Sequence, residues 1–101
     1  MPKTETTNWD PSEHLETKEE MANYLEAALE DGDSSLIAAA LGDIARSKGM
    51  ASIAEATGLG RESLYKSLSE NGNPELATVL KVVEALGLRL TAVPSDSDRA
   101  A

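Results

Sequence analysis

The sequence contains no cysteine and no phenylalanine, a single histidine and only three aromatic residues. Without cysteine it has neither a disulfide framework nor a zinc site of the Cys/His type. It also lacks a thiol nucleophile, and a single histidine disfavours a Ser-His-Asp site. We therefore predict a protein that is not an enzyme and that uses no metal or other cofactor. The scarcity of aromatic residues predicts a core built from Leu, Ile, Val and Ala.

Long apolar runs are absent as well. No stretch approaches the roughly 18–20 residues of a membrane span, and the first ten residues lack the apolar segment of a signal peptide. A chain of 101 residues is long enough for one small domain with a tail. These features predict a soluble cytoplasmic protein that does not associate with membranes.

Basic residues are scarce in the N-terminal third of the chain. The formal net charge is −9, and residues 1–32 carry nine acids against two bases, a net charge of −7. Residues 33–93 carry seven acids against six bases and are nearly neutral. An acidic extension thus precedes a nearly neutral domain, and this asymmetry indicates two partners or two tasks.

The apolar pattern divides the chain into four parts. Residues 1–16 are polar without an apolar period, and we predict a flexible acidic arm. Residues 17–32 form a leader helix, because Thr17 and Glu20 have the spacing of a capping box and an apolar stripe follows. Residues 33–93 form the main domain, and 94–101 a disordered polar tail. In the arm, Trp9 either folds back on the domain or anchors a partner.

Within residues 33–93 the sequence predicts four more helices. The first begins after Asp33 or Ser34 and carries an apolar stripe up to Ala45. Two short helices follow at 50–57 and 61–69. The last begins with Asn73 as N-cap and Pro74 as its first residue, and its apolar set is Leu76, Val79, Leu80, Val83 and Leu86. Residues 88–93 alternate as a short strand, which would pair with the same segment of a second copy in a dimer.

Residues 50–68 contain the most informative pattern. Two short helices joined by a tight turn cross closely, which requires a small residue such as Ala54 and a turn residue such as Gly58 that adopts positive φ. Apolar anchors flank the turn at Ile53, Leu59, Leu64 and Leu68. This is the pattern of a helix-turn-helix, whose second helix lies in the major groove of DNA.

The side chains of this motif suit contacts with a duplex. Arginine pairs with guanine and glutamate accepts from cytosine in the major groove, whereas serine and asparagine bind phosphates. The alternative is a solvated surface on which Arg61 and Glu62 neutralise each other. We predict DNA contacts from Ser52, Arg61, Glu62, Ser63, Tyr65, Lys66, Asn71 and Asn73.

Several segments together resemble a known family. They are residues 45–50, 57–68, 72–74 and 78–88, with 13–15 and 24–29 upstream. They are similar to the addiction-module antidote family, the HigA-like antitoxins with a Cro/cI-type (Xre) helix-turn-helix. The resemblance covers roughly residues 9–93, and Thr57–Leu68 is its most specific part. Two positions depart from the motif: Ala51 stands where Ser or Thr would cap the first helix, and Gly60 where Ser often caps the second.

The resemblance implies an all-α, five-helix Cro/cI-type domain with the acidic extension and the short C-terminal strand. It further implies an antitoxin that binds a small basic toxin of the RelE/ParE superfamily and represses its own operator, acting as a homodimer on double-stranded DNA. Two other hypotheses compete with this one. The chain is a stand-alone, prophage-type repressor without a toxin, or a toxin-binding module that no longer binds DNA.

The acidic extension is the candidate toxin-binding surface. Apolar anchors among acidic residues suit a basic partner, because opposite charges also accelerate association. The alternative for the helix stripe is packing on the domain's own core. The predicted toxin contacts are Trp9, Leu15, Met21, Tyr24, Leu25 and Leu29.

Overall fold

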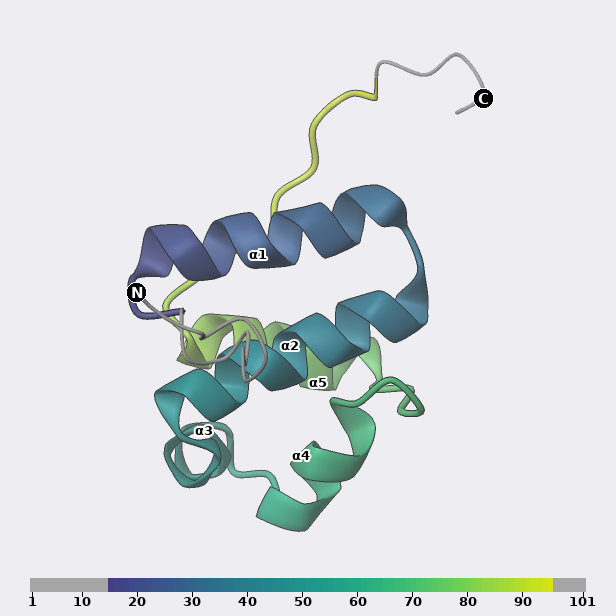
Figure 1. Cartoon of the computed structure of the whole chain (residues 1–101). Coiled ribbons are helices and arrows are strands. Elements are labelled where there is room, and N and C mark those ends of the chain that lie inside the picture. Colours follow the sequence, from purple (N-terminus) through teal and green to yellow (C-terminus); the bar gives the residue numbers. More distant parts are fainter. Residues whose placement is uncertain (1–14, 96–101) are drawn as a thin grey trace, which may run out of the picture.

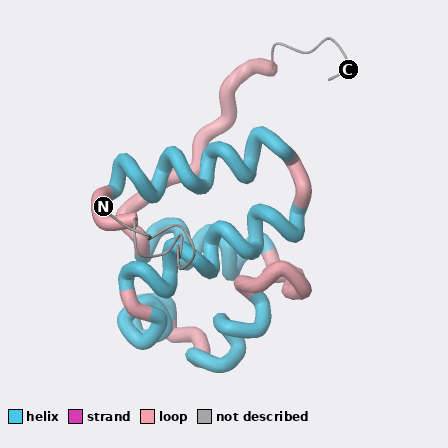
Figure 2. Tube along the Cα trace, viewed as in Figure 1, coloured by secondary structure: helices cyan, strands magenta, loops and turns pink. Residues whose placement is uncertain are grey.

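The computed structural model describes residues 15–95, and this part of the chain is entirely helical apart from its loops (Figures 1 and 2). It contains five α-helices and no β-strand: α1 (Lys18–Asp31), α2 (Ser34–Lys48), α3 (Met50–Thr57), α4 (Arg61–Ser67) and α5 (Leu76–Ala85). The prediction of an all-α, five-helix chain is confirmed. Within residues 15–95, no helix is long and apolar enough to span a membrane.

The first two helices begin where their capping residues predict. The Glu20 amide donates to the Thr17 hydroxyl at 3.1 Å, and the Thr17 amide donates to the Glu20 carboxylate at 3.0 Å. These two bonds form the capping box and satisfy amides that the first turn leaves unpaired. Helix α1 ends at Gly32, and the Asp33 side chain then accepts from the Ser35 amide at the start of α2.

Helices α1 and α2 run antiparallel, one over the other (Figure 1). The Tyr24 hydroxyl donates to the Asp43 carboxylate at 2.5 Å, which joins the middle of the two helices. Asp43 also forms an ion pair with Arg46. Near the C-terminal end of α2, the Ser47 hydroxyl donates to the carbonyl of Leu15 at 2.6 Å. These bonds hold α1 and the residues just before it against α2.

Tyr24→Phe removes the hydroxyl from this contact and keeps the ring. We expect the free energy of unfolding to fall by about 1 kcal/mol, since a partly buried hydrogen bond is lost while Asp43 retains Arg46. Urea denaturation measures the change. Tyr65→Phe is the matched control, because the Tyr65 side chain is 46% exposed. Equal stability of the two variants would contradict a stabilising role for the Tyr24 hydroxyl.

One hydrophobic cluster contains buried side chains from all five helices. Its members are aliphatic or methionine side chains, as the scarcity of aromatics predicts: Leu15, Met21, Leu25, Ala40, Leu41, Ile44, Ala45, Met50, Ile53, Leu64, Leu68, Val82, Val83 and Leu86. Helix α1 therefore shares a core with the rest of the described chain.

Helix α5 differs from its prediction at its start and in its buried face. Its first residue is Leu76, and the first helical bond runs from the Val79 amide to the Glu75 carbonyl. Asn73 and Pro74 therefore lie in the preceding loop, because the backbone is still extended at Glu75. Leu76 and Leu80 are 69% and 49% exposed. Val83 and Leu86 are buried as predicted, and Val82, which lies outside the predicted set, is buried as well.

Residues 88–93 do not form the predicted strand, and the described residues 15–95 contain no other strand. The Leu88 amide donates to the Val83 carbonyl and so completes the end of α5. Beyond it the chain passes along α1 (Figure 1), with Leu88 and Leu90 partly buried against the core. A strand requires a neighbouring strand for its ladder, and the single described chain offers none.

Candidate nucleic-acid interface and partner surface

Helices α3 and α4 are joined by the short turn at residues 58–60. Gly58 follows α3 with φ 76°, the left-handed conformation that glycine adopts without a steric penalty. Its amide donates to the Ala54 carbonyl at 2.9 Å. The Thr57 hydroxyl donates to the Ile53 carbonyl and accepts from the Leu59 amide, which fixes the turn. The chain leaves α3 sharply and begins α4 after Gly60.

The apolar anchors of the motif pack as their spacing predicts. Ile53 and Leu64 are buried within α3 and α4, and Leu68 is buried directly after α4. Ala54 and Leu59 are partly buried against the same core. Gly60 precedes α4 in an extended conformation and offers no side-chain cap. Helix α4 is therefore a short element held by the core on one side and facing solvent on the other.

The observed start of α3 shows that Ala51 is not at the capping position expected for it. Gly49 is the N-cap and Met50 is the first helical residue, so Ala51 lies inside the helix and is not in the capping position. Gly49 ends α2 and begins α3: its amide donates to the Ala45 carbonyl, and its carbonyl accepts from the Ile53 amide. Because Gly49 connects the two helices directly, no separate capping residue fits between them.

The structure places every predicted DNA-contacting residue at an exposed position. Ser52 lies in the first turn of α3, and Asn71 and Asn73 lie in the loop after α4. The other five come from α4 itself, namely Arg61, Glu62, Ser63, Tyr65 and Lys66. Within residues 15–95, Arg61 and Lys66 form no ion pair. The charges of Arg61 and Glu62 are thus not joined in a contact, and the basic side chains remain accessible.

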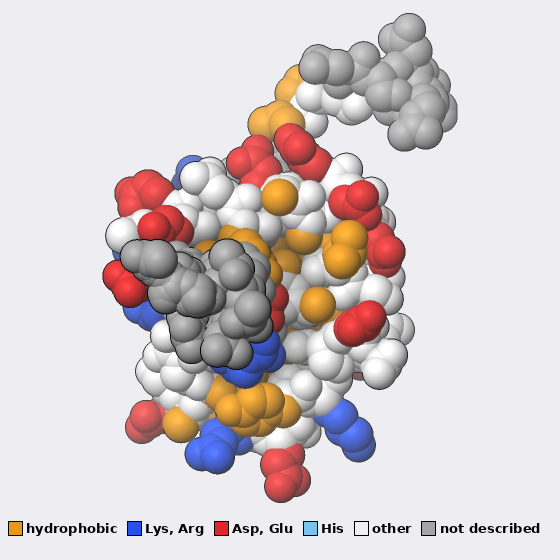
Figure 3. Space-filling view, viewed as in Figure 1, with side chains coloured by type: hydrophobic (Ala, Val, Ile, Leu, Met, Phe, Trp, Pro, Cys, Tyr) orange, Lys and Arg blue, Asp and Glu red, His pale blue; other side chains and the backbone are white. Residues whose placement is uncertain are grey.

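Charge is distributed unevenly over the surface. Figure 3 shows many acidic side chains over the part of the molecule that contains α1, and Lys and Arg side chains beside an apolar patch at the end that contains α3 and α4. Helix α1 carries five acids and one base, whereas α4 carries two bases and one acid. The end with α3 and α4 is therefore less acidic than the part that contains α1.

The predicted toxin contacts fall into four groups. Met21 and Leu25 are buried in the core of this chain, as the alternative of core packing predicts for the helix stripe, and Leu15, which precedes the stripe, is buried there too. Tyr24 is half-buried and bonded to Asp43. Leu29 is 41% exposed, whereas Trp9 lies outside the described residues. On α1, a partner can therefore reach Leu29 and the acidic side chains around it.

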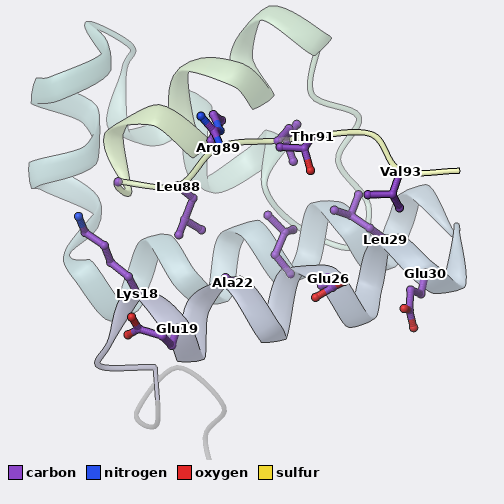
Figure 4. A pocket seen from close by; sticks show the side chains of 13 residues that line it. Lys18, Glu19, Ala22, Glu26, Leu29, Glu30, Leu88, Arg89, Thr91 and Val93 are labelled. Carbon is purple, nitrogen blue, oxygen red and sulfur yellow. The ribbon is translucent and has the colours of Figure 1, made fainter.

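A groove lies beside Leu29, and the sequence pattern of α1 did not indicate it. It runs between α1 and residues 87–93 and has a volume of about 600 Å³. Its apolar lining comes from both sides and includes Leu29, Leu88, Leu90 and Val93 (Figure 4). The C-terminal half of this lining looked like a dimerisation strand in the sequence, so nothing there signalled a groove with α1. The described residues contain no cluster of metal-ligating side chains.

A comparison with known families identifies the chain. Residues 5–94 match the family described as "Probable addiction module antidote protein". The chain belongs to this addiction module antidote family. A relative in Haemophilus influenzae is 49% identical over 82 residues, which cover 81% of this chain and 84% of the relative, and it is named "Uncharacterized protein". No solved structure matches the chain. Membership of the antidote family indicates an antitoxin role and a toxin as partner.

Proposed function

We propose that this chain is the antitoxin of a type II toxin–antitoxin module. It neutralises a toxin of the RelE/ParE superfamily by direct binding, and as a homodimer it represses its own operon through the α3–α4 unit. The match to the antidote family over residues 5–94 carries this proposal. In the family that the sequence resembles, the partner is encoded beside the antitoxin and is usually an mRNA-cleaving ribonuclease.

Exposure of α4 supports the DNA-binding half of the proposal. Its buried side chain, Leu64, faces the core, and its charged side chains face solvent. A helix held in this way can enter a major groove with the residues of its first turn near the bases. Arg61 is the residue best placed to read a base, because it opens the helix and arginine pairs bidentately with guanine.

Electrostatics support the toxin-binding half. A protein that cleaves RNA needs a basic groove for the phosphates. The acidic extension and α1 are complementary to such a surface, and long-range attraction increases the association rate. The charge of −7 over residues 1–32 is remote in sequence from α3 and α4. One short chain can thus present an acidic surface to a basic toxin and a basic helix to DNA.

The decisive experiment is co-expression with the small basic protein encoded beside the gene. We expect growth arrest by that protein alone, rescue by this chain, and co-purification of the two. Footprinting upstream of the reading frame should show a protected sequence at physiological ionic strength. Protection without rescue would favour the stand-alone repressor, and rescue without protection would favour a toxin-binding module without DNA binding. Failure of both would contradict the proposal.

Deleting residues 1–14 tests the arm and keeps every described residue, including the buried Leu15. We expect toxin affinity to fall by about 2 kcal/mol, the scale of a tryptophan anchor, because Trp9 is removed. Operator affinity should stay unchanged. Deleting residues 1–32 would be a poorer test, since it also removes the buried Leu15, Met21 and Leu25. A variant lacking 96–101 is the control, and equal toxin affinity of the two deletions would count against Trp9 as an anchor.

A further inference from the structure

The groove beside α1 has one helical wall and one extended wall. Residues 87–93 form the extended wall and run along α1 from near Lys18 toward Leu29 and Val93 (Figure 4). The Lys18 side chain lies close over Gly87 and narrows the groove at that end. At the other end, Val93 is 80% exposed and Leu29 is 41% exposed. The groove is therefore most accessible near the C-terminal end of α1.

The extended wall has backbone groups that no strand uses. Among residues 15–95, the amides of 89–93 and the carbonyls of 89–94 take part in no backbone–backbone hydrogen bond, and Pro94 has no amide to donate. Leu88 and Leu90 nevertheless attach this segment to the core. An extended segment that is fixed in place and unpaired is a template for another strand, and peptides are commonly bound in this way.

Acidic side chains surround the accessible end. Glu26 and Glu30 line the groove on either side of Leu29, one helical turn apart. Both are exposed, and Asp31 follows directly in the chain. The basic lining residues are Lys18, at the narrow end, and Arg89, whose side chain points away from α1 (Figure 4). A segment that enters near Leu29 meets an apolar surface bordered by carboxylates.

We propose that this groove is the docking site for an extended segment of the toxin in which basic and apolar residues alternate. The segment adds as a strand beside residues 89–94, places its apolar side chains against Leu29 and Val93, and pairs its basic side chains with Glu26 and Glu30. This inference rests on the proposed antitoxin function and assigns the site at which it is exercised.

Charge decides between the occupants. A second copy that paired its own residues 88–93 with this segment would also bring another acidic α1, with its net charge of −4, toward the first. The chain's own residues 1–14 carry three acids and one base, so they too are repelled by Glu26 and Glu30. A basic segment is attracted instead. The groove therefore fits the partner whose charge is opposite to that of α1.

The position of the groove has a consequence for regulation. Helix α2 packs against α1 on one side and against α3 and α4 on the other, so it lies between the groove and the DNA-binding unit (Figure 1). A toxin bound beside α1 leaves Arg61 and Lys66 accessible. The arrangement therefore leaves room for the toxin and the operator on the same chain at once.

Two substitutions in the groove test the proposal with the full chain and with the small basic protein encoded beside its gene. Leu29→Ser removes the apolar anchor, and Glu26→Lys reverses the charge. The second also replaces a like-charged pair with Glu30 by an opposite-charged pair, which does not weaken the helix. We expect each to reduce toxin affinity by at least about tenfold, as central interface residues do.

The matched controls lie on α5, outside the groove. Leu80→Ser alters a leucine of similar exposure, at 49%, and Glu84→Lys reverses an exposed acid on a helix. Toxin affinity should change by less than about twofold with either control, on the scale of residues that border no interface. Operator binding by Leu29→Ser and Glu26→Lys should equal that of the wild type. Gel-shift assays with toxin and operator together should show a ternary complex.

Amide hydrogen exchange provides a separate measurement. We expect alternate amides within 89–94 to become protected when the toxin binds, since a strand bonds every second residue of its neighbour. If both groove variants bind the toxin with the affinity of the wild type, the groove is not the docking site. The antitoxin function would then stand. A wild-type chain that binds no toxin overturns both. Loss of dimerisation in Leu29→Ser at unchanged toxin affinity would assign the groove to a second copy and also overturn the proposal.

Discussion

Replacing Gly42 with alanine is expected to destabilise the domain by about 2 kcal/mol or more. Helix propensity alone predicts the opposite, since alanine is favoured over glycine by roughly 1 kcal/mol inside a helix. Gly42 lies within α2 and is buried. A β-carbon at this position would lie 2.0 Å from the carbonyl oxygen of Leu68, far closer than the 3.4–4 Å of ordinary contact.

The clash cannot be relieved by turning a side chain. The atom that Gly42 faces belongs to the backbone just after α4, and Leu68 is itself buried in the core. The chain following α4 is also confined at Gly72, where a β-carbon would lie 2.1 Å from the Ser67 carbonyl oxygen. Moving the Leu68 carbonyl therefore moves the end of α4, so the variant should also weaken operator binding.

Thermal and urea denaturation measure the stability of Gly42→Ala. A loss of about 2 kcal/mol lowers Tm by roughly 10 °C in a domain of this size. Gly60→Ser is the matched control, because a β-carbon there is no closer than 3.6 Å to its neighbours and serine is a favourable N-cap. Its stability should stay equal or rise by a few tenths of a kcal/mol. A more stable Gly42→Ala variant would show that α4 does not press on α2 at this point.

The sequence predicts correctly those structural features that depend on residues close together in the chain. The capping box of Thr17 and Glu20 and the cap at Asp33 involve neighbours within a few positions, and both are present. The turn at Gly58 follows from the same kind of signal. The pattern of residues 50–68 is local as well, and it indicates every exposed residue of α4.

Features that depend on contacts between distant segments were not predictable. Helix α5 has apolar residues around more than one face, so periodicity alone did not show that Val82 is buried and Leu76 exposed. The apolar stripe of α1 suited a partner or the core equally well, and only its packing against α2 and the shared core distinguishes the two. The groove requires both α1 and residues 87–93, which are more than fifty positions apart. Gly42 and Leu68 are 26 positions apart and likewise meet only in the folded chain.

Arg61→Ala is expected to weaken specific operator binding by about 1–3 kcal/mol, which corresponds to roughly 5- to 150-fold. Arg61 is exposed and free of ion pairs among residues 15–95, so its guanidinium is available to a base without first breaking a contact. Removing a base contact relaxes discrimination at one position of the site. Binding to random DNA should therefore change much less than binding to the operator.

The strongly acidic composition helps to separate operator binding from binding to random DNA in this test. A net charge of −9 repels the DNA backbone, so sequence-independent affinity is low and specific contacts dominate. Lys66→Ala removes a charge from the same helix. We expect it to lower the affinity for operator and random DNA equally, and to reduce the slope of log affinity against log salt concentration by about one. Lys81→Ala on α5 is the control and should leave both affinities unchanged. If Arg61→Ala behaves like Lys81→Ala, α4 does not read the bases and the repressor half of the proposal fails.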